Sequence, residues 1–355
     1  MTISYYNRFV QDDLHELLLR KIPYDKLKDK AVLITGANGM LPTYIVYMLQ
    51  YLNEKCNFNI KIYALVRNSH KAHMRFKGIR ESGNFFLLEQ DVCEPLHIDG
   101  QIDYIIHAAG NASPKCIIND PVDIIKANSI GTLNVLELAR MKKIKKIIYT
   151  STREVYGKMN ENITEIGESD FGILDTMEIR SCYPESKRLA ETMFACYGYQ
   201  YDLHCCVARI AHSYGPGMAI ENDGRVMADF IGDIVNKRDI ILKSTGEAKR
   251  AFCYISDTIA ALILILLEGE DGAAYNVANE TEERKICDVA DMLIKMYPEQ
   301  NSKLLYNIPK TQGIGYSKMG RVKLSTRKLE DLGWKPEISL ENGLKRTVDS
   351  FIYSD

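Results

Sequence analysis

Short apolar runs alternate with longer stretches of mixed polarity in the first part of the chain. From residue 31 onward the apolar runs are AVLIT, KIYALV, NFFLL, DYIIHA and KKIIYTS. Runs of this length, rich in β-branched residues, are typical of parallel strands buried on both faces. The stretches between several of them have helical character, for example residues 121–140. This alternation predicts an α/β fold built on a doubly wound parallel sheet.

A glycine-containing turn follows the first apolar run. The segment TGANGMLP places Gly36 and Gly39 three residues apart, between the strand and a helix. Glycines at this junction let the backbone turn tightly and let amide groups approach a pyrophosphate at the helix N-terminus. The third position, where a glycine would allow close helix–strand packing, is Pro42, which is tolerated in a first helical turn but should alter the packing near the pyrophosphate. The turn predicts a Rossmann-type, dinucleotide-binding sheet.

The pattern divides the chain into three predicted parts. Residues 1–29 form an N-terminal helical extension with Leu14, Leu17 and Leu18 on one side, packed on the domain or on a second subunit. Residues 30–210 form the dinucleotide-binding domain. After the apolar run YDLHCCVARI, a Gly-Pro-Gly turn opens residues 211–355. We expect this last part to be mainly a smaller C-terminal substrate-binding lobe, with returns to the main sheet.

Composition narrows the class of protein further. Lys and Arg number 45 against 47 Asp and Glu, so the chain lacks the basic excess of a nucleic-acid-binding protein. No segment reaches the roughly 20 apolar residues of a membrane span, and the N-terminus has no signal-peptide apolar region. The nine cysteines contain no C-x-x-C pair, and the seven histidines show no metal-ligand spacing. We therefore expect a cytoplasmic enzyme with reduced thiols, no metal and no membrane or nucleic-acid partner.

The end of the second apolar run bears on the choice of cofactor. NAD sites place an Asp or Glu there to accept a hydrogen bond from the ribose 2′-hydroxyl, whereas NADP sites use a cation for the 2′-phosphate. Here KIYALV is followed by Arg67 and Asn68, and no carboxylate follows until Glu81. An arginine forms a fork that suits a phosphate. Arg67 therefore favours NADP(H), with NAD still possible if Arg67 is an ordinary surface arginine.

A second group of residues is suited to acid–base chemistry. The segment YPESK places Tyr183 and Lys187 four residues apart, on one helical face. A tyrosine is a poor base at neutral pH, but an adjacent ammonium stabilises the phenolate and lowers the tyrosine pKa. The pair is then able to move the proton that accompanies hydride transfer. Upstream, TSTREVYG places Thr152 at the carboxyl edge of the sheet, where ligands bind in open α/β folds.

Taken together, these motifs resemble the extended short-chain dehydrogenase/reductase family. The likeness extends from Ala31 over essentially the whole chain and is strongest to UDP-glucuronate decarboxylases, then to nucleotide-sugar 4,6-dehydratases. Further motifs that carry it are HAAGNASP (107–114), NSIGTLNVLELA (128–139), ARIAHSYGPGM (208–218), NDGRV (222–226), KRAFCYISD (249–257) and LGWKP (332–336). The resemblance implies a nucleotide-sugar substrate. It also implies a homodimer formed through helix faces such as 124–138 and 188–199, with packing on the chain's own sheet as the alternative.

The resemblance also assigns roles to matching positions. Tyr183 would be the acid/base, Lys187 its partner on the nicotinamide ribose and Thr152 the ligand of the reacting oxygen. Glu154 and Asn128 complete the catalytic set, with Asn128 in the proton-relay region. The implied cofactor-binding residues are Gly36, Asn38, Gly39, Met40, Leu41, Arg67, Asp91, Val92, Ala108, Ala109, Tyr183, Lys187 and Ile210. The implied substrate-binding residues are Ser113, Arg153, His212, Arg225 and Arg250.

Some of the substrate-binding assignments have alternatives. Arg225 and Arg250 would face the nucleotide diphosphate, which an arginine fork suits, although Arg225 could equally form a salt bridge at the rim. Arg153 stands where decarboxylase-like members have Ser and dehydratase-like members have Asp. It stays protonated and cannot act as a general acid, so it argues against dehydration and could instead hold a phosphate, carboxylate or carbonyl oxygen, or turn to solvent. His212 replaces the family's Asn, which implies a remodelled sugar pocket unless the histidine is structural.

These departures separate three functional hypotheses. The leading one is an NADPH-dependent reductase of a keto group on a nucleotide-linked sugar, serving surface polysaccharide synthesis, with Thr152 and Arg153 polarising the carbonyl. The alternative is a redox-neutral UDP-glucuronate decarboxylase or nucleotide-sugar epimerase that retains NAD⁺. A third is a non-catalytic sensor that binds a dinucleotide, against which the intact Tyr183, Lys187 and Thr152 argue.

Overall fold

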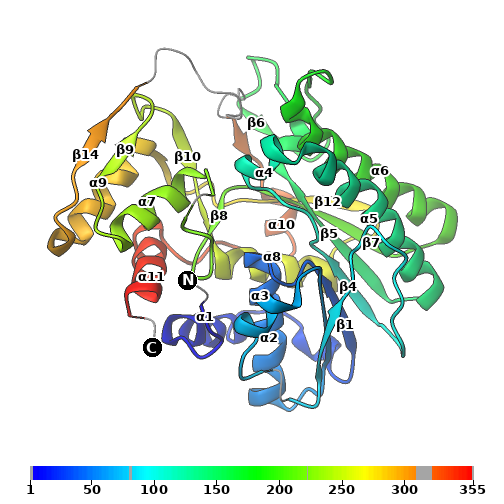
Figure 1. The fold of residues 1–355 in the computed structure, drawn as a ribbon. Coiled ribbons are helices and arrows are strands. Elements are labelled where there is room, and N and C mark those ends of the chain that lie inside the picture. The colour runs from blue at the N-terminus through cyan, green and yellow to red at the C-terminus, as the bar shows by residue number, and fades with distance from the viewer. Residues whose placement is uncertain (1–2, 80–81, 222, 309–321, 354–355) are drawn as a thin grey trace.

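A seven-stranded parallel sheet forms the centre of the molecule (Figure 1). The computed structural model describes residues 3–79, 82–221, 223–308 and 322–353. The strand order is β12-β7-β5-β4-β1-β2-β3. The strand bounds are β1 Ala31–Thr35, β2 Lys61–Val66, β3 Phe85–Glu89, β4 Tyr104–His107, β5 Lys146–Thr152, β7 Cys205–Ile210 and β12 Ala273–Val277. The predicted doubly wound sheet is confirmed, and the order reverses between β1 and β4, where such folds open a ligand crevice.

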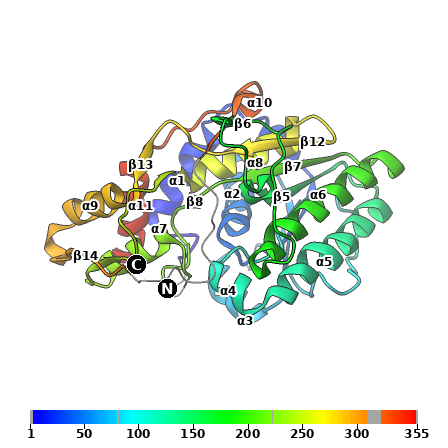
Figure 2. The same cartoon turned by 90° about the horizontal axis from the view of Figure 1, so that it is seen from above.

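Each face of the sheet packs against its own layer of helices (Figure 2). The sheet separates two hydrophobic cores, one on each face. In β1, Val32 and Ile34 belong to one core and Leu33 belongs to the other, because successive side chains of a strand point to opposite faces. The first core is closed by α2 (Met40–Cys56) and α8 (Ile255–Glu268), and the second by α5 (Pro121–Lys142) and α6 (Cys182–Tyr201). Among the described residues, no helix is both long and apolar enough to cross a membrane.

A smaller C-terminal lobe lies beside the sheet, on the left of Figure 1. Two short strand pairs, β9 with β14 and β10 with β13, support its helices. Its elements are α7 Val226–Val235, β9 Ile240–Leu242, β10 Lys249–Ala251, β13 Glu283–Lys285, α9 Ile286–Met296, β14 Leu304–Tyr306 and α11 Leu340–Ile352. The lobe is confirmed, and β12 and α8 return to the main sheet from within residues 211–355. The predicted boundary at residue 210 stays a prediction.

Short elements connect these parts. They are η1 Tyr24–Leu27, α3 Ser69–Arg75, α4 Pro114–Asn119, η2 Arg153–Tyr156, β6 Glu165–Ile166, η3 Ile179–Ser181, β8 Ser213–Tyr214, β11 Cys253–Tyr254, η4 Pro298–Gln300, β15 Lys323–Leu324 and α10 Arg327–Glu330. Two of the two-stranded sheets, β8 with β11 and β6 with β15, are parallel pairs that tie the end of the main sheet to the lobe.

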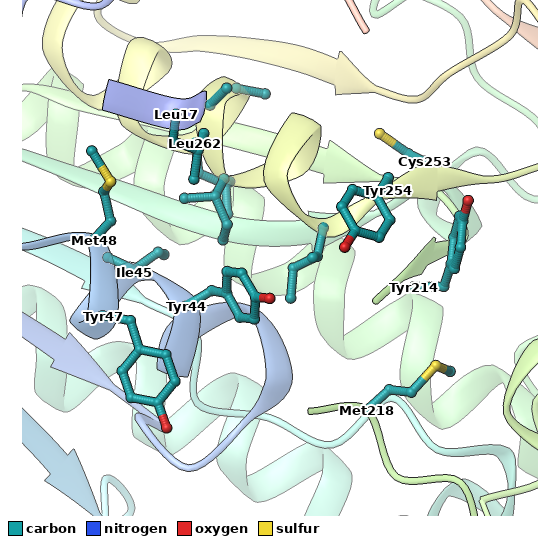
Figure 3. Packing of buried hydrophobic residues seen from close by; sticks show 14 of the residues in the cluster. Leu17, Tyr44, Ile45, Tyr47, Met48, Tyr214, Met218, Cys253, Tyr254 and Leu262 are labelled. Carbon is teal, nitrogen blue, oxygen red and sulfur yellow. The ribbon is translucent and has the colours of Figure 1, made fainter. Parts of the chain in front are cut away.

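The N-terminal helix α1 (Arg8–Leu18) packs against α2, α8 and α11 of its own chain. Its Asp13 is buried and accepts hydrogen bonds from the hydroxyls of Tyr44 (3.0 Å) and Tyr254 (2.8 Å) and from Arg346 (2.8 Å). Figure 3 shows Tyr44 and Tyr254 within this core. Burial raises the pKa of Asp13 to about 6, against the opposing effect of these three donors. The extension is therefore an integral part of the domain.

Candidate active site

A cleft of about 1140 Å³ opens at the carboxyl ends of the central strands. The predicted residues that line it are Gly36, Asn38, Gly39, Met40, Leu41, Arg67, Asp91, Val92, Ala108, Ala109, Ser113, Thr152, Arg153, Glu154, Tyr183, Lys187, Ile210, His212, Arg225 and Arg250. Asn128 is the predicted residue that does not line it. A concave site at this edge, with convergent polar groups, is where open α/β folds bind ligands.

The glycine turn forms one wall of this cleft. Gly36 has a φ of 65°, and a Cβ there would lie 2.8 Å from the carbonyl oxygen of Ala108. Only glycine fits such a position, because both the φ and the space exclude a side chain. Gly39 precedes α2, and Pro42 lies in its first turn, where its missing N–H breaks no helical hydrogen bond. The N-terminus of α2 thus faces the cleft as a pyrophosphate site requires, so these residues fit a dinucleotide.

Arg75 at the end of α3 holds this turn in place and was missed by the sequence analysis. Its guanidinium donates to the carbonyl of Asn38 (2.9 Å) and the hydroxyl of Thr43 (3.1 Å). It also donates to the carbonyl of Gly217 (3.4 Å), in the turn that leads into the lobe. Burial lowers the pKa of Arg75, yet an arginine stays protonated at neutral pH. One half-buried cation thus links the glycine turn to the lobe.

The rim of the cleft at the end of β2 is polar and basic. Arg67, Asn68 and Lys71 line it, and the Asn38 side chain donates to the carbonyl of Asn68 (3.0 Å). Asp91, beyond β3, accepts from the backbone N–H of Cys93 (3.0 Å). Arg67 is exposed on this rim. The cation that the sequence placed here therefore does face the cleft.

Tyr183 and Lys187 lie one turn apart at the start of α6, and both are buried. The Lys187 ammonium donates to the carbonyl of Thr150 (2.8 Å) and lies 4.5 Å from the ring centre of Tyr149. Burial lowers the pKa of Lys187 to about 7. The lowered pKa expected for Tyr183 is wrong for this environment: burial and the nearby Glu154 carboxylate raise it, while a hydrogen bond with Thr152 opposes them.

Glu154 is held by Arg180, a second residue that the sequence analysis missed. The two form an ion pair of 2.8 Å, and both side chains are mostly buried. Thr152 ends β5 and its hydroxyl accepts from the backbone N–H of Glu154 (3.2 Å). Because Arg180 precedes Tyr183 by three residues, the pair connects η2 to the start of α6. No sequence motif marked Arg180, since the contact depends on the tertiary fold.

Asn128 lies behind the cleft rather than in its wall. It is buried in α5, and its side chain donates to the hydroxyl of Ser186 (3.0 Å) and accepts from Tyr149 (3.4 Å). A Cβ on Gly110 would lie 2.9 Å from its oxygen, so Asn128 supports the loop after β4 at close range. Its proposed place in a proton relay stays a prediction.

The substrate end of the cleft carries two arginines from the lobe side of the chain. Arg225 pairs with Asp223, whose Oδ2 lies 2.9 Å from its Nη2, and still lines the cleft. Ser113 donates to the backbone carbonyl of Asp223 (2.9 Å) and so connects this segment to α4. Arg250 lies on β10 and also lines the cleft. Arg225 therefore forms the salt bridge and also lines the cleft, and its contact with a diphosphate stays a prediction.

Arg153 and His212 meet at the same end of the cleft. Arg153 is only 8% exposed, so the interpretation in which it turns to solvent is wrong. Its Nη1 lies 3.4 Å from Nε2 of His212, and its Nη2 donates to the carbonyl of Val322 (3.4 Å). The His212 ring in turn packs against Phe252, with 5.9 Å between ring centres. The two residues that depart from the family pattern at the sugar pocket, Arg153 and His212, are therefore neighbours in space.

In the described ranges, no group of three or more His, Cys, Asp or Glu side chains is arranged to hold a metal ion.

A comparison with protein families matches residues 32–278 to the NAD dependent epimerase/dehydratase family. The match covers the glycine turn, both catalytic helical positions and the substrate-end arginines. The chain belongs to the NAD-dependent epimerase/dehydratase family.

Members of the epimerase/dehydratase family differ in what they do with this scaffold. The chain is 34% identical to UDP-glucuronic acid decarboxylase 3 of Arabidopsis thaliana, over 90% of its length and 88% of the relative's. Among solved structures, a UDP-N-acetylglucosamine 4-epimerase of Methanobrevibacter ruminantium, in complex with UDP-N-acetylmuramic acid, matches with a TM-score of 0.78. It covers 92% of this chain and 99% of its own at 22% identity. An NAD complex of dTDP-glucose 4,6-dehydratase from Bacillus anthracis matches with a TM-score of 0.72 at 19% identity, covering 91% and 96%.

Proposed function

We propose that this protein carries out a redox-neutral conversion of a UDP-linked sugar, with UDP-glucuronate as the substrate and NAD retained through the cycle. The observation that carries the proposal is the meeting of Thr152, Tyr183 and Lys187 inside one cleft that also holds the glycine turn. The 34% identity to a UDP-glucuronic acid decarboxylase supports the choice of substrate. This reverses the order of the sequence-based hypotheses, because the relatives support the redox-neutral alternative better than net reduction.

The chain's own residues provide the acid–base part of the cycle. NAD, when bound along the glycine turn, supplies a reversible two-electron acceptor for a sugar carbon. Tyr183 takes the proton from the sugar hydroxyl and returns it, and Thr152 holds the same oxygen by a hydrogen bond. Lys187, which reaches the Thr150 carbonyl, is placed to bind the ribose hydroxyls and to stabilise the Tyr183 phenolate. The raised pKa of Tyr183 makes this cation necessary, since burial alone disfavours the phenolate.

The diphosphate of the substrate is assigned to the arginines of the lobe. Arg225 and Arg250 line the cleft, and charge-assisted hydrogen bonds from arginine suit a diphosphate. The Asp223 partner of Arg225 fixes the direction of its side chain. Binding the nucleotide in this way leaves the sugar between the arginines and Thr152.

A second candidate rests on a single observation, the position of Arg67 on the rim near Lys71. Two cations at the end of β2 suit the 2′-phosphate of NADP(H). An exchanging NADPH would make the protein a reductase of a keto group on a nucleotide-linked sugar, acting in surface polysaccharide synthesis.

The test separates the two candidates in one preparation. The purified protein is denatured and its released nicotinamide cofactor identified, and the native protein is incubated with UDP-glucuronate while products are followed by NMR. Bound NAD and conversion without added cofactor are expected. Consumption of added NADPH with a nucleotide-linked keto sugar, and no change in UDP-glucuronate, would establish the reductase instead.

A homodimer through α5 and α6 is part of the proposal. These helices lie side by side and expose Ile125 and Leu133 on α5 and Leu189 on α6. Apolar side chains gathered on two adjacent helices suit an isologous interface. Light scattering at working concentration tests it, with Leu133→Asp expected to give a monomer.

A further inference from the structure

The sugar end of the cleft contains a polar pair that the cycle described above does not use. Arg153 follows Thr152 directly at the end of β5, and His212 follows the neighbouring strand β7 by two residues. The adjacency of β5 and β7 in the sheet brings the two together, although they are 59 residues apart in the chain. Both line the cleft. Neither is the residue that the family motif carries at its position.

We infer that Arg153, oriented by His212 and the Val322 carbonyl, binds a carboxylate on the sugar and thereby prevents its loss. The inference rests on the proposed function, because it assigns the fate of the sugar in that same site. The protein then returns a UDP-linked uronic acid inverted at C4, rather than the pentose that decarboxylation would give.

The contacts of Arg153 determine the direction of its guanidinium. Nη1 faces Nε2 of His212 and Nη2 faces the carbonyl of Val322, each at 3.4 Å. Arg153 stays protonated at neutral pH, so its guanidinium is the donor in this contact when Nε2 of His212 carries no proton. A guanidinium carries five N–H donors in a planar fork, a shape that matches a carboxylate. At 8% exposure, this charge is screened little by solvent ions.

The position of Arg153 places that fork close to the reacting carbon. Thr152, its neighbour in the chain, is the residue assigned to the sugar oxygen at C4, and the C5 carboxylate is one carbon further along the ring. Glu154, on the other side of Arg153, is paired with Arg180. His212 is fixed by its contact with Phe252 and by a φ of 47°, in the left-handed region. The pair is therefore held beside the site of oxidation.

Decarboxylation and epimerisation share their first step and differ in what happens to the carboxylate. Both reactions begin when C4 gives up a hydride, which NAD bound along the glycine turn would accept, and the C4 hydroxyl gives up its proton to Tyr183, so that C4 becomes a ketone. In decarboxylation, the C5–C6 bond breaks, CO₂ leaves and the electron pair passes to the C4 oxygen as an enolate; C5 is then protonated and C4 reduced. In epimerisation, that bond stays intact and C4 is reduced on its other face. Each cycle returns the cofactor unchanged.

A cation bound to the carboxylate favours epimerisation over decarboxylation. The negative charge lies on the carboxylate before the C5–C6 bond breaks, and on the C4 oxygen afterwards. A fork on the carboxylate thus stabilises the starting state more than the transition state and raises the barrier to CO₂ loss. A serine at this position, as in decarboxylase-like relatives, offers no such charge.

The test measures the number of carbons in the product sugar and the affinity for the nucleotide sugar. Wild-type protein, Arg153→Ser and Arg153→Lys are incubated with UDP-glucuronate, and the six-carbon and five-carbon products are quantified by NMR. Dissociation constants for UDP-glucuronate and UDP-glucose, which lacks the carboxylate, are measured by calorimetry. Arg8→Ser, far out on the exposed side of α1, is the matched control for loss of an arginine. Retention of NAD by each variant verifies that it is folded.

We expect the wild type to yield the C4 epimer. Arg153→Ser should raise the five-carbon fraction about tenfold and lower the preference for UDP-glucuronate over UDP-glucose by a similar factor, with Arg153→Lys in between. A wild type that releases the pentose as its main product overturns the inference and leaves the proposed function standing. If UDP-glucuronate does not turn over, the proposed function fails. The ratio of the two dissociation constants then tests the inference by itself, and an unchanged ratio in Arg153→Ser overturns the carboxylate contact.

Discussion

The two ends of the cleft are built in different ways. The cofactor end depends on backbone: Gly36 fits against Ala108 because it has no Cβ, and α2 presents its N-terminus to the pyrophosphate. The sugar end depends on side chains, with Arg153, His212 and the lobe arginines contributed by separate segments. Backbone geometry tolerates little variation, whereas side chains at strand ends are exchanged without disturbing the sheet. We therefore expect backbone geometry to determine cofactor binding, and the side chains of the proposed sugar end to determine which reaction follows.

The largest expected effect comes from disrupting the glycine turn at the cofactor end of the cleft. In Gly36→Val, the new side chain starts 2.8 Å from the Ala108 carbonyl at a φ of 65°, so the turn and the loop after β4 cannot both keep their places. We expect loss of retained cofactor, measured by chromatography of the denatured protein. Gly83→Ala is the control, because nothing lies within 4 Å of a Cβ there. A Gly36→Val protein with a full complement of cofactor would contradict the backbone argument.

Next in size is the loss of the proton carrier. Tyr183→Phe removes the hydroxyl that we propose moves the sugar proton, and general acid–base groups contribute about 10²–10⁴-fold to rate. We expect kcat to fall within this range while the dissociation constant for the nucleotide sugar changes little. Steady-state kinetics and calorimetry on the same preparation test both. Unchanged turnover would revive the hypothesis of a non-catalytic dinucleotide sensor.

The sequence predicted the backbone end better than the side-chain end, for a physical reason. Apolar runs predicted β1 to β5 because buried parallel strands need continuous apolar residues, and the spacing of Gly36 and Gly39 marked the turn. Arg75 and Arg180 were missed because their partners are brought to them only by the tertiary fold. The pKa of Tyr183 was predicted in the wrong direction because burial is not visible in a Y-x-x-x-K spacing.

Lys187 is assigned both to the ribose of the cofactor and to the Tyr183 phenolate, so it connects the two ends of the cleft. The pH dependence of cofactor binding tests this assignment. The pKa of Lys187 lies at about 7, below the usual value, so the ammonium is present below pH 7 and is lost as the pH rises through 7. Since the ammonium form donates to the ribose, affinity for NAD should fall up to about tenfold per pH unit above 7. Fluorescence titrations from pH 6 to pH 9, a range of about three units, measure this. Lys187→Met should bind weakly at every pH, and a pH-dependent Lys187→Met would assign the titration to another group.

The smallest expected effect lies at Arg67, where the cofactor end itself depends on a side chain. If Arg67 contacts a 2′-phosphate, Arg67→Ser should weaken NADP⁺ binding about tenfold, the size of one charge-assisted contact, and leave NAD⁺ binding nearly unchanged. Lys71→Ser, on the same rim, is the matched comparison for loss of a nearby cation. Equal weakening of both cofactors would show that Arg67 contacts a part they share, and the preference for NADP(H) would be lost. The 2′ position is where a retained NAD and an exchanging NADPH differ chemically, so the side chains on this rim are where the two candidate functions are distinguished.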